Sequence, residues 1–266
     1  MRKGEAAMNG KTKRPLPAKA SDSKRAKGAL AACFWLAAWE AAALIVGRPL
    51  LLPGPIDTLR ALAALGRTAA FWRSTGMTLL RILTGYGAAV LLGVLLAAVC
   101  VRVRAVDTLL SPLRSVIRAT PVSSFIMLVL IWIRRDGVPV FISFLMVLPI
   151  VWTGVEEALL SVDAQLVEMT RAYRLTAWKK IRFLYAPAVR PAFLAACTTG
   201  LGFAWKSGIA AEVIALPAQS VGKNLYDAKI YLERADLFAW TLTVIVLSML
   251  LEALLRRVVR ERRVSA

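Results

Sequence analysis

The amino-acid sequence predicts an all-α polytopic membrane protein with about six transmembrane helices. Of its 266 residues, 58% are hydrophobic, and the mean hydropathy is +0.62. Charged residues make up only 19% of the chain and are gathered in blocks between long apolar runs. Continuous apolar runs of about 18 residues or more are typical of membrane helices, whereas a barrel would show alternation.

Six apolar stretches are long enough to be predicted as membrane spans. In the second, Gly93 and Ala97 have the spacing of small residues that lets helices approach closely in lipid. The third contains Pro112, Pro121 and several polar residues, so we expect an interruption that faces protein or a water-filled cavity. Residues 56–73 are predicted as an amphipathic helix at the membrane interface. The expected spans are 29–46, 79–101, 109–133, 138–160, 191–216 and 237–255.

The distribution of basic residues predicts the orientation of these spans. With six spans, 22 Lys and Arg residues fall on the side of the N-terminus and ten on the opposite side. The positive-inside rule therefore places both termini and the long loop 161–190 in the cytoplasm. We expect residues 1–28 to be a disordered basic tail, 29–259 a permease domain, and 260–266 a C-terminal tail. The net charge of +19 is explained by orientation and anionic lipid rather than by nucleic acid.

Catalytic, cofactor and metal sites are not expected. The chain has no histidine, and its cysteines, Cys33, Cys100 and Cys197, have no metal-ligand spacing. A Ser-His or Cys-His catalytic set is therefore impossible. The sequence predicts a transport subunit and not an enzyme.

The loop 161–190 is more regular than a linker. Asp163 is a good N-cap for a helix over 164–173, Thr176 is a second candidate N-cap, and Pro187 is expected to end the second helix. Each helix carries one apolar stripe, which suits either a groove in a partner protein or a lipid surface. The stripes are formed by Leu166, Met169 and Tyr173, and by Trp178, Ile181 and Tyr185.

Within this loop the chain resembles a known family. Glu168-Met169-Thr170 and Leu184-Tyr185-Ala186-Pro187 match the spacing of the pattern E-A-A-x3-G-x9-I-x-L-P without a gap, although Arg174 occupies its glycine position and Ala186 its leucine. This pattern marks permease subunits of binding-protein-dependent ABC importers. The resemblance covers about 52–259 and is closest to the nitrate, sulfonate and taurine group. It is supported by LLPGPIDTL, TLLRILTGYGAAVLLGVLLA, the element Arg118–Val122, and VDAQLVEMTRAY.

The resemblance implies a type I ABC importer permease fold in the cytoplasmic membrane, with the loop as its coupling helix. It implies cytoplasmic ABC ATPase subunits that hydrolyse the ATP, a second permease subunit in a homodimer or heterodimer, and an extracytoplasmic substrate-binding protein. Where glycine is expected, Arg174 can adopt a positive φ only at some cost. The residues expected to dock the ATPase are Asp163, Glu168, Met169, Thr170, Arg171, Arg174, Trp178, Lys179 and Pro187.

Charged residues within spans are costly and are usually functional. Lys206, together with Arg118 on the interrupted third span, is expected to make a translocation pathway attractive to an anion, so we predict a small anionic nutrient such as a sulfonate or nitrate. A stand-alone secondary transporter or channel, or a permease for a vitamin precursor or metal oxyanion, is the alternative. The pathway candidates are Arg118, Ser123, Ser124, Lys206, Ser207 and Glu212.

Overall fold

The computed structural model describes residues 19–47 and 51–264, and within them every regular element is a helix. The prediction of an all-α protein is confirmed. Two compact units are distinguished, Met1–Pro55 and Ile56–Ala266. Residues 1–18 of the predicted tail, and the last two residues of the C-terminal tail, lie outside the described residues.

The first unit contains helix α1, Lys19–Val46. It starts ten residues before the predicted first span and so includes part of the predicted disordered tail, because Ala, Lys and Arg are good helix formers. Gly47 follows with a φ of 61°, a left-handed conformation that suits glycine at a helix end. The indole Nε1 of Trp39 donates to the Pro53 carbonyl at 3.2 Å and ties the following turn to the helix.

Two helices, α2 (Pro55–Gly66) and α3 (Ala69–Arg102), replace the single interface helix predicted over 56–73. That prediction is wrong because Thr68 starts a new helix. Its hydroxyl accepts a hydrogen bond from the Phe71 amide at 3.3 Å, which is the N-cap interaction that satisfies a free amide at a helix start. Residues 69–73 therefore belong to the same helix as the second span.

The core of the second unit is built by α6 (Val138–Leu160), which packs against both α3 and α9 (Ala186–Ala215). A seam of buried small residues runs along α3 at every fourth position, Gly85, Ala89, Gly93 and Ala97. A Cβ on Gly85 would lie 2.2 Å from the Val140 carbonyl oxygen, and one on Gly93 would lie 3.0 Å from the Val151 Cβ. The predicted close helix approach is confirmed.

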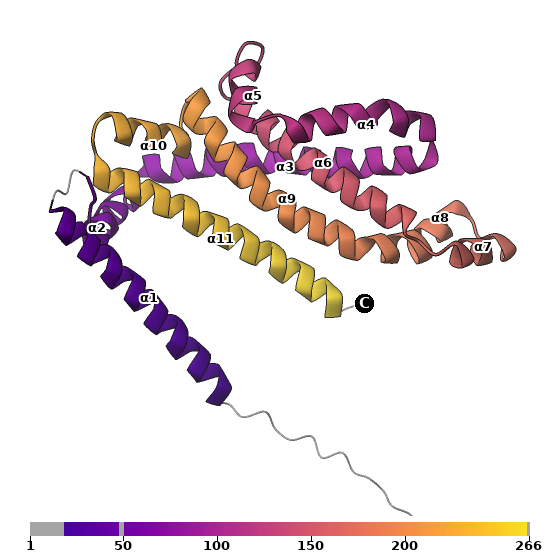
Figure 1. Cartoon of the computed structure of the whole chain (residues 1–266), viewed down its shortest axis with the longest axis horizontal. Helices are drawn as coiled ribbons and strands as arrows, with labels where there is room; N and C mark the ends of the chain where they lie inside the picture. The colour runs from indigo at the N-terminus through magenta and orange to yellow at the C-terminus, as the bar shows by residue number, and fades with distance from the viewer. Residues whose placement is uncertain (1–18, 48–50, 265–266) are drawn as a thin grey trace, which may run out of the picture. The chain divides into compact units, whose positions relative to one another are not determined.

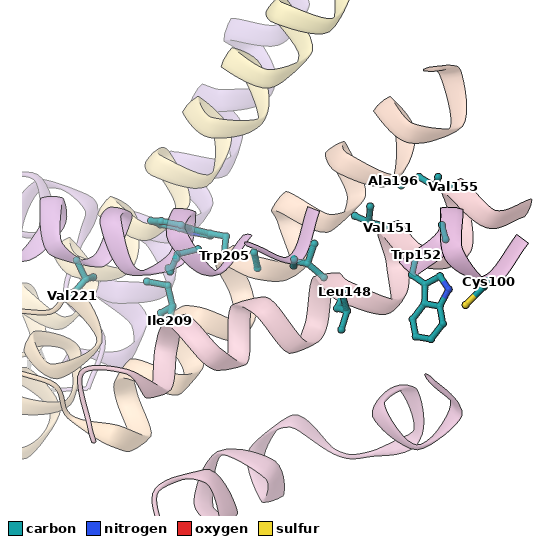
Figure 2. Packing of buried hydrophobic residues seen from close by; sticks show 14 of the residues in the cluster. Cys100, Leu148, Val151, Trp152, Val155, Ala196, Trp205, Ile209 and Val221 are labelled. Carbon is teal, nitrogen blue, oxygen red and sulfur yellow. The ribbon is translucent and has the colours of Figure 1, made fainter. Parts of the chain in front are cut away.

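Large side chains fill the space beside this seam. Trp152 of α6 and Trp205 of α9 are 1% and 2% exposed, and Val151 is fully buried between them along the bundle (Figure 2). The Trp205 indole also donates to the Val244 carbonyl at 3.1 Å, which ties α9 to α11 (Arg234–Val264). Cys100 and Cys197 are buried, while Cys33 is exposed.

The predicted third span is interrupted, as expected. It forms α4 (Arg104–Ala119) and α5 (Val122–Val129), separated by extended backbone at Thr120 and Pro121. No residue of α4 is buried.

The fifth span is longer than predicted because the second loop helix runs into it. Helix α8 (Ala177–Lys180) continues through a π-helical turn, η1 (Ile181–Tyr185), into α9. The prediction that Pro187 ends a helix is therefore wrong. The wide turn lets the Ala186 amide bond the Ile181 carbonyl, so the missing proline N–H falls where the hydrogen-bond register already changes.

By length and composition, three of the described helices can cross a membrane: Ala69–Arg102, Val138–Leu160 and Arg234–Arg257. The other predicted spans lie in α1, whose apolar part Cys33–Val46 is short, in the broken pair α4–α5, and in α9, which carries Lys206 and Glu212. Helix α10 (Val221–Ile230) and the loop helices α7 (Ala164–Ala172) and α8 lie at opposite ends of the bundle of the second unit (Figure 1).

Candidate functional site

Arg118 of α4 and Lys206 of α9 line one open cavity of about 590 Å³. The two residues are 88 positions apart in the sequence, and the packing of α4 and α9 against α6 brings them together. Most of the remaining lining is apolar. It consists of Ile117, Thr120, Val122, Met146, Pro149, Ile150, Thr199, Phe203, Ser207 and Ala210.

The two positive charges in this cavity have no carboxylate partner. The Arg118 Nη2 donates to the Thr153 hydroxyl at 2.8 Å, which is a neutral acceptor. Within the described part of the chain, neither Arg118 nor Lys206 forms an ion pair, and no Asp or Glu lines the cavity. The cavity therefore carries a net positive charge, which favours an anion.

A second open cavity of about 730 Å³ shares Arg118, Ile150 and Thr199 with the first. It is lined by the second half of α6, from Thr153 to the helix end, and by the first half of α9. Because Ser161 at the end of α6 lies in its wall, this cavity leads from the cationic cavity toward the loop end of the bundle. It contains one acidic lining residue, Glu157.

The serine candidates are separated by the structure. Ser207 lines the cationic cavity, but its hydroxyl already donates to the Phe203 carbonyl at 2.8 Å. Ser123 and Ser124 are exposed at the start of α5 and line neither of these two cavities. Their role in a pathway stays a prediction.

Glu212 is also separated from the cavity. Its side chain is fully buried, and both carboxylate oxygens accept from the Thr78 hydroxyl, at 2.8 and 3.0 Å. The Gly222 amide at the start of α10 donates to it at 3.1 Å. Arg81 of α3 lies 3.5 Å from the same carboxylate. These contacts tie α3 and α10 to α9, and Glu212 has no place in the lining of the cationic cavity.

Arg81 extends this buried network to a fourth segment. Its Nη2 bonds Asp136, in the turn before α6, at 2.8 Å and the Ala218 carbonyl at 2.8 Å, while Nη1 bonds the Gln219 carbonyl at 3.2 Å. Arg81 was not among the residues predicted from the sequence to form a site. The available signal was an arginine inside the apolar stretch LLRIL, but its partners are up to 138 residues away.

A second ion-paired cluster links α4 to α6. Arg114 forms ion pairs with Glu156 and, at 3.2 Å, with Asp107. Its guanidinium also lies over the Trp152 ring, 4.7 Å from the centroid. Glu156 is therefore a buried partner of Arg114.

The first helix of the loop 161–190 is α7, and Asp163 caps it as predicted, since its carboxylate accepts from the Gln165 amide at 2.8 Å. Thr170 faces inward and is 3% exposed. The apolar stripe of α7 is uncovered, with Leu166, Met169 and Tyr173 exposed by 44%, 48% and 75%.

The remaining docking candidates lie on other exposed faces of the loop. Glu168 and Arg171 are exposed on α7, away from the apolar stripe. On α8, Trp178 is 68% exposed, and its neighbour Lys179 is exposed as well. Pro187 is exposed at the start of α9. The loop thus presents apolar and charged groups together at one end of the bundle (Figure 1).

Arg174 adopts the backbone conformation for which the pattern uses glycine. Its φ is 48°. The Arg174 amide bonds the Arg171 carbonyl at 2.9 Å, and the Leu175 amide bonds the Thr170 carbonyl at 3.0 Å. These two bonds form a Schellman motif that ends α7. The bend of the family pattern is kept, and the arginine adopts it in spite of its Cβ.

Comparison with known proteins identifies the family. Residues 89–264, more than half of the chain, match the family described as the binding-protein-dependent transport system inner membrane component. The chain belongs to this family. It is an ABC importer permease subunit and a membrane protein, as its apolar helices indicate.

Relatives of this permease subunit agree with the family. A probable ABC transporter permease of Brucella melitensis is 26% identical over 77% of this chain and 84% of its own length. The riboflavin transport system permease protein RibX of Chloroflexus aurantiacus is 27% identical over 82% of this chain and 85% of its own length. The taurine transport system permease protein TauC of Escherichia coli is 26% identical over 84% of this chain and 82% of its own length.

A solved structure shares the fold. The crystal structure of an amino acid ABC transporter with histidines covers 76% of this chain and 97% of its own, with a TM-score of 0.56 and 18% identity. The similarity supports the expected permease fold for the helical bundle.

Proposed function

We propose that this permease subunit forms one wall of a translocation pathway for a small anion and that its loop 161–190 docks a cytoplasmic ABC ATPase. The observation that carries the pathway is the placement in a single cavity of two cations, Arg118 and Lys206, that form no ion pair among the described residues. Family membership favours an importer subunit over a stand-alone transporter.

The anion is favoured by electrostatics. A positive charge at membrane depth is costly without a counter-charge, and two such charges in one mostly apolar cavity raise the local concentration of small anions. An anion bound between Arg118 and Lys206 would supply the missing negative charge. Taurine, named for one relative, carries a sulfonate, which is one group that fits this description.

The cavity is open in a single chain, since Arg118, Phe203, Lys206 and Ala210 are exposed along it. A second permease subunit, identical or different, would close this side and complete the pathway. An extracytoplasmic binding protein would then deliver the solute from the side opposite the loop. These assignments follow from the family and from the positive-inside rule, which puts the loop and both termini in the cytoplasm.

The loop suits protein docking. Its exposed stripe of Leu166, Met169 and Tyr173 has the spacing with which a helix fits an apolar groove. Trp178 adds a large aromatic surface of the kind that dominates protein interfaces. Glu168, Arg171 and Lys179 flank it with charges able to orient the ATPase.

The anionic pathway is tested by charge-selective labelling of a cysteine placed at Ala210, in a chain whose exposed Cys33 is replaced by serine. We expect 2-sulfonatoethyl methanethiosulfonate to react faster than 2-trimethylammonioethyl methanethiosulfonate on the order of tenfold, after each rate is divided by that with 2-mercaptoethanol. The preference should fall in Arg118→Gln and in Lys206→Gln. Arg73→Gln, which removes an exposed arginine that lines neither cavity, is the matched control, and equal rates in the parent would refute the proposal.

ATPase docking is tested by placing a negative charge on the apolar stripe. Met169→Asp should reduce co-purification of the ATPase with the tagged permease by about tenfold, because the aspartate would be desolvated in the contact. Ala164→Asp adds the same charge to the first turn of α7, away from the stripe, where a carboxylate is tolerated. If Met169→Asp and Ala164→Asp bind the ATPase equally, the stripe contacts lipid instead.

A further inference from the structure

Arg118 stands where the two cavities meet. It lines both of them, together with Ile150 and Thr199. On one side the described lining adds a second cation, Lys206, and on the other an acid, Glu157. The sign of the charge therefore reverses along the path from the centre of the bundle toward the loop.

Glu157 and Arg118 line the same cavity. The guanidinium bonds Thr153 at 2.8 Å, and Glu157 is four residues further along α6, so the two side chains are neighbours one turn apart on the same helix face. Glu157 is exposed to the cavity and has no ion pair among the residues of the described chain. Turning the Arg118 side chain from Thr153 toward Glu157 would exchange a hydroxyl acceptor for a carboxylate.

The neighbouring pair on the same two helices shows that this kind of ion pair forms here. One turn before Arg118 on α4, Arg114 is already paired with Glu156 of α6. Because Arg114 is held by Glu156 and Asp107, it does not compete for Glu157. Of these two arginines, Arg118 is the one whose hydrogen-bond partner is neutral.

We propose that Glu157 is an internal competitor that displaces the transported anion from Arg118. The inference rests on the anionic pathway proposed above. In the cationic cavity Arg118 and Lys206 hold the anion. When Arg118 turns toward Glu157, its charge is neutralised by the carboxylate, the anion keeps Lys206 alone, and its affinity falls as the path opens toward the loop.

The strength of such a pair suits a reversible step. Glu157 is exposed, so its pairing with Arg118 is partly screened by water and is weak compared with the buried pairs. A weak internal pair lowers the affinity for the anion without blocking its binding. An equally placed glutamine would remove the competition and would retain the anion longer.

The test measures the binding of ethanesulfonate to the purified full-length permease. The cysteine at Ala210 is labelled with N-ethylmaleimide, and the ethanesulfonate concentration that halves the labelling rate reports the apparent affinity. We expect Glu157→Gln to raise that affinity about fivefold, and we expect no change when it is made in the Arg118→Gln background. Glu252→Gln, which removes a partly exposed carboxylate that pairs with Arg256 outside both cavities, should leave the affinity unchanged.

Each other result is decisive. If Glu157→Gln raises the affinity equally with and without Arg118, the carboxylate acts by direct repulsion and the competition is refuted. If it changes the affinity in neither background while ethanesulfonate still protects, the competition is again refuted and the anionic pathway stands. If ethanesulfonate gives no protection and the labelling at Ala210 shows no charge preference, the anionic pathway itself fails.

Discussion

Two groups of charged residues in the second unit are built in opposite ways. The network of Arg81, Glu212 and Asp136 contains both signs, and its arginine and glutamate are almost completely buried. The cavity of Arg118 and Lys206 contains one sign, and both side chains are exposed to open space. The two groups share one helix, since Glu212 and Lys206 both belong to α9.

The difference separates structure from function. A charge removed from solvent must be paired and hydrogen bonded, because the alternative is a large desolvation penalty. Arg81 and Glu212 meet that condition with their own chain and have no capacity left for a ligand. Arg118 and Lys206 have no such counter-charge among the described residues. We expect the transported solute to supply it. We therefore expect unpaired charge, rather than intramembrane charge alone, to mark the pathway.

The largest effect should come from breaking the buried network of Arg81. Arg81→Gln leaves Glu212 buried without its counter-charge, and we expect a loss of about 3 kcal/mol in the free energy of unfolding. Thermal unfolding of the detergent-purified protein measures it. Arg73→Gln on the same helix removes an exposed arginine and should change the stability by less than about 0.5 kcal/mol. Equal effects of the two substitutions would contradict the comparison.

A matched pair on α4 gives the next effect. Arg114→Gln removes two ion pairs and a cation–π contact and should destabilise the protein by about 2 kcal/mol. Arg118→Gln, one turn away, removes only a hydrogen bond to an exposed side chain and should cost less than about 0.5 kcal/mol. The same melting experiment compares them. A larger loss for Arg118 would mean that its role is structural.

The smallest expected effect is a gain. Arg174→Gly relieves a left-handed conformation that is unfavourable for a residue with a Cβ, so the protein should be more stable by about 1 kcal/mol. Here the cost of an arginine is conformational and not electrostatic. Arg174→Ala keeps the strain and should show no gain. A gain in the alanine variant would point to charge repulsion with Arg171 instead.

The main helices were predictable because apolar runs are local. The predicted span 138–160 coincides with α6, and the break in the third span lies at Thr120 and Pro121, as its composition indicated. The errors arose where capping and hydrogen-bond register decide. The Thr68 cap divides the predicted interface helix, and the π-helical turn carries the chain through Pro187.

The candidate site was predictable in part. The cost of charge in a span singled out Lys206 and Arg118, which share a cavity in the structure, but it singled out Glu212 equally. What separates them is pairing across the fold, and Arg81 is 131 residues from Glu212. Glu157 was missed because adjacent acidic residues at a helix end resemble a solvated boundary, although Glu156 and Glu157 face different environments.

Close contacts at glycines of α3 and α9 limit which helices beside the cavity can move. Gly85 and Gly93 bring α3 against the backbone of α6, and Gly200 and Gly208 place α9 within contact of Val147 and Ser143 on its other side. Helices in such close contact cannot slide past one another without clashes, so we expect α3, α6 and α9 to move as one rigid group. Helix α4 has no buried residue and extended backbone at both ends. We therefore expect the cavity to change through small shifts of α4 about its Arg114–Glu156 ion pair, and these shifts would carry Arg118 with them.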